Sequence, residues 1–318
     1  MAPLPAWPLP FTVAVGAFRT ILRHFPQNIA ESSFSTQSFL QPVTNNVGWP
    51  AQLLPQEVTV KSDVVRGVRG EWYLPKASAS EADGREEGSL LLWAHGGGFA
   101  FCSPGTHRMF LARVAALTGV RVFCVDYRKP PDHPFPVPVE DVMGAFRVFQ
   151  DPGLSERLFL GGDSAGGNLA LAATRAMIEP SVALRPPEGL VLLSPWVDLS
   201  DAGKGWKHNK VDYIPANLAQ VVAKHYAGSV PLDDARVSPA LSDDWRAFPR
   251  VLLDYGGNEN FRPQIERMQA AMLRGGVDVD SRAEEGMIHG YPLWEFAWGN
   301  GPGPFEKYFD RLRAFLRR

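Results

Sequence analysis

The amino-acid sequence predicts an α/β fold in which a mostly parallel sheet is covered by helices on both faces. Segments with the apolar pattern of strands alternate with segments of helical spacing along most of the 318 residues. Residues 90–94 form a continuous apolar run, as expected for a strand that is covered on both sides. A closing helix is expected at 305–316, because its phenylalanines and leucines recur at helical spacing.

The individual elements follow in order. Residues 57–63 alternate apolar and polar side chains and predict a strand; a second strand is expected at 68–74, where Pro75 stops it. These two strands predict an antiparallel start to the sheet, followed by a surface loop at 77–89. After that loop we expect strands at 90–94, 121–126, 158–160, 190–193, 251–254 and 277–282, and helices at 108–117, 140–149, 167–178, 264–274 and 305–316.

Two segments depart from this alternation. Residues 1–55 are rich in proline, aromatic and amide residues, with a helix expected from Phe11 toward His24. Residues 201–247 interrupt the alternation and contain a helix expected to begin at Pro215. We therefore expect an N-terminal cap segment at 1–55, a cap insertion at 201–247, and a core formed by 56–200 and 248–318.

The composition is typical of a globular protein. The chain is 45% hydrophobic and 21% charged, with a net charge of −2, so nothing favours nucleic acid or an anionic membrane as a partner. Its two cysteines, Cys102 and Cys124, are too few for a disulfide framework; Cys124 is expected to be buried, and no cysteine–histidine pattern indicates a catalytic thiol.

The N-terminal residues do not predict export or membrane insertion. The first ten residues contain four prolines and no basic residue, unlike a secretory signal, and the apolar stretch from Phe11 to Phe18 is too short to span a bilayer. We expect a cytoplasmic protein, and the sequence leaves its oligomeric state open, with a homodimer among the alternatives.

The string Gly162-Asp163-Ser164-Ala165-Gly166 has the G-x-S-x-G pattern of a nucleophile elbow. In such an elbow the serine stands on a sharp strand-to-helix turn, and the flanking glycines allow strand and helix to pass closely. A predicted strand precedes the string and a predicted helix follows it, which is the required context. Ser164 is therefore the candidate nucleophile.

A second string, His95-Gly96-Gly97-Gly98-Phe99, follows the strand at 90–94. A glycine run of this kind directs backbone N–H groups at a developing oxyanion, so Gly97, Gly98 and the N–H of Ala165 form the candidate oxyanion hole. We expect His95 to brace this loop. No Gly-Lys-Ser/Thr string follows, which argues against a phosphate-binding loop, and no histidine pair has metal-ligand spacing, so no cofactor is expected.

A serine hydroxyl needs a base, and the base needs an acid to orient it. His289, in a short loop after the last predicted strand, is the candidate base. Two carboxylates, Asp254 at a strand end and Glu259 in the loop beyond, are candidates for the acid. We prefer Glu259, because a loop carboxylate can turn toward the histidine.

Several strings together resemble the hormone-sensitive-lipase family of α/β-hydrolases, also called class IV esterases. Besides the two strings above, residues 126–136 (DYRKPPDHPFP), 194–198 (SPWVD) and Ser238-Pro239 are similar to family motifs, and the resemblance covers about 57–318. It implies an α/β-hydrolase fold with a mostly parallel eight-stranded sheet and a cap, and a triad of Ser164, Glu259 and His289. Most members carry aspartate in a D-P-L string at the acid position; glutamate here is similar to some fungal members.

The chemistry and the resemblance predict a carboxylic ester hydrolase. Five aromatic residues are candidates for a pocket that takes an apolar substrate, with burial in the core as the alternative: Phe99, Phe101, Trp196, Tyr213 and Trp294. Two other functions remain open. The triad could serve a tailoring step of secondary metabolism, such as deacetylation, lactone formation or acyl transfer, or the fold could serve as a small-molecule receptor.

Overall fold

A computed structural model describes residues 7–23, 53–76, 88–151, 157–203, 206, 211–298 and 302–318. Most of the expected cap at 1–55 and of the expected loop at 77–89 lies outside these ranges. The strands are β1 (Val58–Val65), β2 (Val68–Pro75), β3 (Ser89–Ala94), β4 (Arg121–Val125), β5 (Arg157–Asp163), β6 (Gly189–Leu193), β7 (Arg250–Gly256) and β8 (Val279–Glu284). The α-helices are α1 (Leu9–Arg23), α4 (Arg108–Thr118), α5 (Val137–Phe149), α6 (Ala165–Met177), α7 (Ala216–Ala227), α8 (Arg262–Arg274) and α9 (Phe305–Arg317).

The strands form one eight-stranded sheet in the order β1-β2-β4-β3-β5-β6-β7-β8. β2 pairs antiparallel with both β1 and β4, and all pairings from β4 to β8 are parallel. The predicted mostly parallel sheet with an antiparallel start is therefore confirmed. Because the strands from β3 onward run the same way, the loops that follow them gather at one edge, where ligands bind in sheets of this kind.

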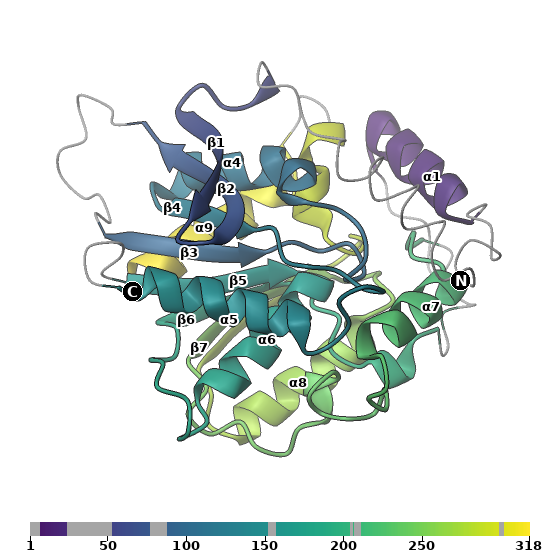
Figure 1. Ribbon diagram of the computed structural model, residues 1–318. Coiled ribbons are helices and arrows are strands. Elements are labelled where there is room, and N and C mark those ends of the chain that lie inside the picture. Colours follow the sequence, from purple (N-terminus) through teal and green to yellow (C-terminus); the bar gives the residue numbers. More distant parts are fainter. Residues whose placement is uncertain are drawn as a thin grey trace.

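Helices cover both faces of the sheet (Figure 1). α5, α6 and α8 lie on one face, and α4 and α9 lie on the other. Successive residues of β3 divide between the two cores: Leu90 and Leu92 pack with the first group of helices, Leu91 and Trp93 with the second. All of these side chains are fully buried, which explains why the strand is apolar from Leu90 to Ala94 instead of alternating.

Element boundaries differ from the expectations by a few residues. α5 begins at Val137, three residues before its expected start, because Pro138 fits the first turn of a helix, where no N–H partner is needed. β5 continues through Gly161 and Gly162 to Asp163, although two glycines give no strand pattern. This extension brings the strand directly to Ser164.

Candidate active site

Ser164 lies between β5 and α6, at a turn with the geometry of a nucleophile elbow. Its backbone has φ 53° and ψ −121°, a strained conformation that costs about 1–3 kcal/mol and must be held by its surroundings. The elbow leaves no room for side chains beside it, because a Cβ on Gly166 would overlap the carbonyl of Ala94. The serine N–H donates to the carbonyl of Leu193 at 2.9 Å, and its own carbonyl accepts from the N–H of Trp196 at 2.9 Å.

The glycine loop follows β3 and lies against the elbow. Gly97 and Gly98 have φ of +111° and +59°, values that favour glycine and turn the backbone sharply after the strand. Ala165 is the first residue of α6, so its N–H has no partner within the helix. The loop thus follows the neighbouring strand at the same edge of the sheet as the elbow.

Asp163 belongs to the elbow string, but the motif alone gives it no role; in the structure it joins the glycine loop to the elbow. Its carboxylate accepts from the N–H of Gly96 and from Nε1 of Trp93, both at 3.0 Å, and lies 3.1 Å from Nε2 of His107. Burial opposes ionisation, but the charge and hydrogen bond of His107 and the two N–H donors outweigh it, so the pKa of Asp163 lies below its ordinary value. The carboxylate is therefore an anionic brace for the loop.

His95 is fully buried beneath the loop. Its Nδ1 lies 2.7 Å from the carbonyl of Gly96, and its ring stacks on Tyr127, whose hydroxyl donates to the carbonyl of His95 at 2.9 Å. Burial, with the nearby charges of Lys129 and His107, holds the pKa of His95 well below its ordinary value. A neutral ring fixed in this way fits the expected bracing role.

The candidate acid and base lie beside each other, in the loops after β7 and β8. Nδ1 of His289 is 3.6 Å from Oε1 of Glu259, just beyond hydrogen-bond distance, and neither atom has a hydrogen-bond partner among the described residues. Oε2 of Glu259 accepts from Oγ of Ser194 at 2.6 Å and from the N–H of Gly256 at 2.8 Å. Ser194 Oγ also accepts from the N–H of Gly290 at 2.9 Å, so one hydroxyl joins the two loops.

The second candidate acid, Asp254, is engaged elsewhere. It is fully buried, forms an ion pair with Arg311 of α9 and accepts from the hydroxyl of Tyr291 at 2.7 Å. Burial raises its pKa to about 7 despite the arginine. Its contacts stabilise the packing of α9 and leave Glu259 as the carboxylate that faces His289.

Protonation of His289 is favoured by its neighbours. Burial alone would lower its pKa, but the adjacent carboxylate of Glu259, with the charges of Asp212 and Asp163, raises it above the ordinary value of 6.5. A histidine base can accept a proton from a nucleophile and later return it.

Aromatic residues surround the site in two groups. Phe99 stacks on Tyr226 of α7, with ring centroids 3.7 Å apart, and lies near Trp196. Tyr213 lies between His289 and Trp294, with centroids 6.0 Å and 5.4 Å away. Phe99 and Trp196 are buried in the core on the side of the sheet that α5, α6 and α8 cover. Burial in the core was the alternative to a pocket for these residues.

Phe101, the fifth candidate pocket residue, and Cys102 both follow the glycine loop. Phe101 packs half-buried against the same core, and Cys102 is half-buried with φ +68°. Burial raises the pKa of Cys102 to about 11, which keeps the thiol protonated.

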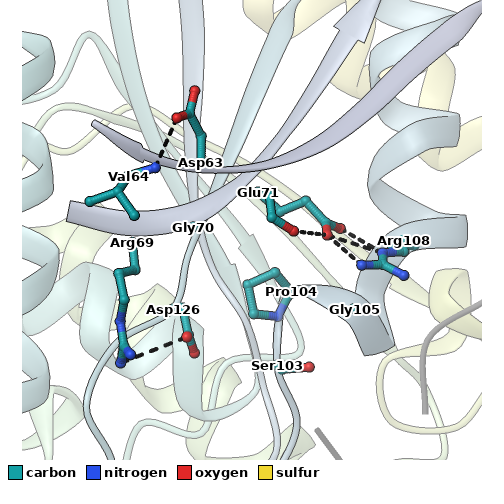
Figure 2. A pocket seen from close by; sticks show the side chains of 11 residues that line it. Asp63, Val64, Arg69, Gly70, Glu71, Ser103, Pro104, Gly105, Arg108 and Asp126 are labelled. Atoms are coloured by element: carbon teal, nitrogen blue, oxygen red, sulfur yellow. Dashed lines mark hydrogen bonds and ion pairs between the residues drawn. The ribbon is translucent and has the colours of Figure 1, made fainter. Parts of the chain in front are cut away.

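A separate cavity of about 650 Å³ opens beside β2 and the segment Ser103–Gly105 (Figure 2). Its charged groups are paired: Arg108 donates to Glu71 at 2.7 Å, and Arg69 lies 3.9 Å from Asp126. None of the three candidate triad residues lines this cavity. In the described part of the chain, no group of three or more histidine, cysteine, aspartate or glutamate side chains is arranged to hold a metal.

Comparison with known proteins identifies relatives of the whole fold. Residues 91–293 match the family described as alpha/beta hydrolase fold. The chain is 32% identical to an acetyl-hydrolase of Streptomyces hygroscopicus over 69% of its length and 71% of the relative's, and 29% identical to an esterase of Acinetobacter venetianus over 88% and 92%. The crystal structure of an esterase from the bacterial hormone-sensitive lipase family superposes with a TM-score of 0.79 at 26% identity, covering 98% of both chains.

The chain therefore belongs to the α/β-hydrolase family. Its likeness to the hormone-sensitive-lipase esterases identifies it as a hydrolase of the carboxylesterase type. Within the described ranges, no helix is long and apolar enough to cross a membrane.

Proposed function

We propose that this chain hydrolyses apolar or natural-product-like carboxylic esters, with Ser164 as nucleophile, His289 as general base and Glu259 as the orienting acid. The observation that carries the proposal is the 3.6 Å approach of Glu259 to His289, in loops at the edge of the sheet where the elbow stands. Catalytic groups are often separated by more than a hydrogen-bond distance until substrate binds.

In the proposed reaction, Nε2 of His289 accepts the hydroxyl proton while Oγ of Ser164 attacks the ester carbonyl. The N–H groups of Gly97, Gly98 and Ala165 stabilise the oxyanion that forms, and Glu259 stabilises the protonated imidazole. The protonated imidazole then gives its proton to the departing alcohol, which leaves the acyl group on Ser164. Water, deprotonated by the same imidazole, releases the carboxylic acid and restores the serine.

Two direct experiments test this function. A panel of p-nitrophenyl esters of graded acyl length would report hydrolysis, and a fluorophosphonate probe followed by mass spectrometry would report a reactive serine. Turnover together with an adduct on Ser164 would support the proposal. An unlabelled Ser164 in folded protein would instead favour a receptor.

A tailoring deacetylase is the second candidate, because one relative, from Streptomyces hygroscopicus, is named an acetyl-hydrolase. Such an enzyme would use the same serine and base on an acetylated product of secondary metabolism. Near inertness toward simple p-nitrophenyl esters, with an intact Ser164 adduct, would favour this candidate.

The pH dependence of hydrolysis provides a further prediction. Because His289 must be neutral to accept the serine proton and its pKa is raised above 6.5, kcat/KM should increase with pH through a midpoint above 6.5. The measurement is kcat/KM between pH 5 and 9 under conditions where the protein stays folded. A midpoint well below 6.5 would contradict this assignment of the base.

We also propose that segment 201–247 acts as a cap insertion that shapes the acyl pocket, with 1–55 as a second cap segment. Support comes from α7, where Cγ2 of Val222 lies 3.1 Å from the position that a Cβ on Gly98 would occupy, and Tyr226 stacks on Phe99. α7 therefore forms a wall beside the proposed oxyanion hole.

If α7 limits the acyl chain, Val222→Ala should raise kcat/KM for hexanoyl relative to acetyl esters. Removing two methyl groups enlarges the space beside Gly98, and differences of this size change selectivity about 10-fold. The measurement is the ratio of the two kcat/KM values, with Val230→Ala, outside α7, as the control. An unchanged ratio would contradict the role of this wall.

A further inference from the structure

Asp212 contacts both loops that carry the proposed acid and base. Its Oδ2 accepts from the N–H of Asn260, the residue after Glu259, at 2.8 Å. Its Oδ1 accepts from the N–H of His289 at 3.3 Å and from the N–H of Tyr213 at 3.0 Å. The side chain belongs to the proposed cap insertion, so one carboxylate connects three segments that are distant in sequence.

The surroundings of Asp212 strengthen this connection. The residue is only 4% exposed, and Nδ2 of Asn260 also donates to the carbonyl of Ile214 at 3.3 Å, which adds a second bond between the acid loop and the cap insertion. The ring of Tyr213 lies edge-to-face with His289. A buried carboxylate that accepts several backbone N–H bonds is held in one position.

Asp212 also bears a charge close to the base. The titratable groups that face it are His289 and Glu259 from the two loops, Tyr213 from its own segment and Arg19 from α1. Burial raises the pKa of Asp212 to about 6, with His289 opposing that rise, so the carboxylate is ionised at neutral pH. Its negative charge in turn favours the protonated form of His289.

We propose that Asp212 is a positioning residue for ester hydrolysis: it holds the acid loop and the base loop together from the cap insertion, and its charge stabilises protonated His289. This inference rests on the proposed function. It differs from the role of Ser194, whose uncharged hydroxyl joins the same loops without contributing a charge. The position of the cap insertion against these two loops would thus set the alignment of His289 with Glu259.

The test is Asp212→Asn, assayed by kcat, KM and the pH profile of kcat/KM with p-nitrophenyl acetate. Asparagine keeps one carbonyl oxygen but loses the charge and the second acceptor. We expect kcat to fall about 10- to 100-fold, the effect of misplacing a catalytic group slightly, with KM within about 3-fold of the native value. The acid limb of the profile, which is the pH range where kcat/KM rises with pH, should move to lower pH. Removing the negative charge of Asp212 lowers the pKa of His289.

Two further variants complete the test. Asp198→Asn is the matched control: Asp198 is also 4% exposed, accepts from a backbone N–H at 3.1 Å and is paired with Arg267, but it contacts neither loop. Asp212→Glu retains the charge on a longer side chain, so its acid limb should stay near the native position while kcat falls. This variant also keeps the proposal testable if Asp212→Asn fails to fold.

The outcomes separate this inference from the proposed function. If native protein neither hydrolyses esters nor reacts with fluorophosphonate at Ser164, the proposed function fails. If native protein does both, but Asp212→Asn keeps its kcat within about 3-fold, the positioning role is overturned. A fall in kcat with an unmoved acid limb, or an equal fall in Asp198→Asn, would make Asp212 a purely structural residue and would also overturn it.

Discussion

Ser164→Ala is expected to lower kcat for ester hydrolysis by at least about 10³-fold, which corresponds to about 4 kcal/mol of transition-state stabilisation. The substitution removes the Oγ that would form the acyl-enzyme and leaves water as the only nucleophile. Residual turnover should remain above the rate in water, because the N–H groups of Gly97 and Gly98 can still bind an oxyanion.

The fold should survive this substitution. Ser164 holds its strained backbone through the N–H and carbonyl bonds to Leu193 and Trp196, which an alanine retains. The measurements are kcat, the melting temperature and fluorophosphonate labelling, with Ser200→Ala as the control serine. A Ser164→Ala variant that keeps more than about a tenth of the native kcat would show that another group performs the reaction.

The sequence predicted a strand well where helices cover both faces of that strand. β3 is apolar from Leu90 to Ala94 because helices cover both of its faces, and that continuous run was visible without coordinates. The end of β5 was not visible, because Gly161 and Gly162 belong to the strand through pairing with β3 and β6, and no side-chain pattern records such pairing. The start of α5 shifted for a similar reason: Pro138 suits a first helical turn as well as a loop.

The proposed site was predictable only where a local motif specifies it. The elbow and the glycine loop are short strings, so Ser164, Gly97 and Gly98 could be found by inspection. Asp163 and Ser194 lie within recognised motifs, but their roles depend on partners far along the chain: Gly96 is 67 residues from Asp163, and Glu259 is 65 residues from Ser194. Asp212 belongs to no recognised motif, so only the folded arrangement of three segments reveals its contacts.

Glu259→Gln is expected to lower kcat about 10²- to 10⁴-fold, whereas Asp254→Asn should leave kcat within about 3-fold. The difference follows from hydrogen-bond direction. The Oε2 position accepts from Ser194 and Gly256, so in the glutamine variant the amide oxygen must occupy that position and the NH₂ must face Nδ1 of His289. Nδ1 then becomes an acceptor, the proton moves to Nε2, and the imidazole can no longer accept the proton of Ser164.

Asp254→Asn tests the other candidate acid with a matched chemical change. This substitution breaks the ion pair with Arg311 and weakens the bond from Tyr291, so it should reduce the free energy of unfolding by about 1–3 kcal/mol without altering the imidazole tautomer. The comparison requires kcat at a temperature at which both variants are folded, together with denaturant midpoints for each. A larger loss of kcat in Asp254→Asn than in Glu259→Gln would reverse the assignment of the acid, because the tautomer argument allows only the carboxylate that faces Nδ1 to control the proton on Nε2.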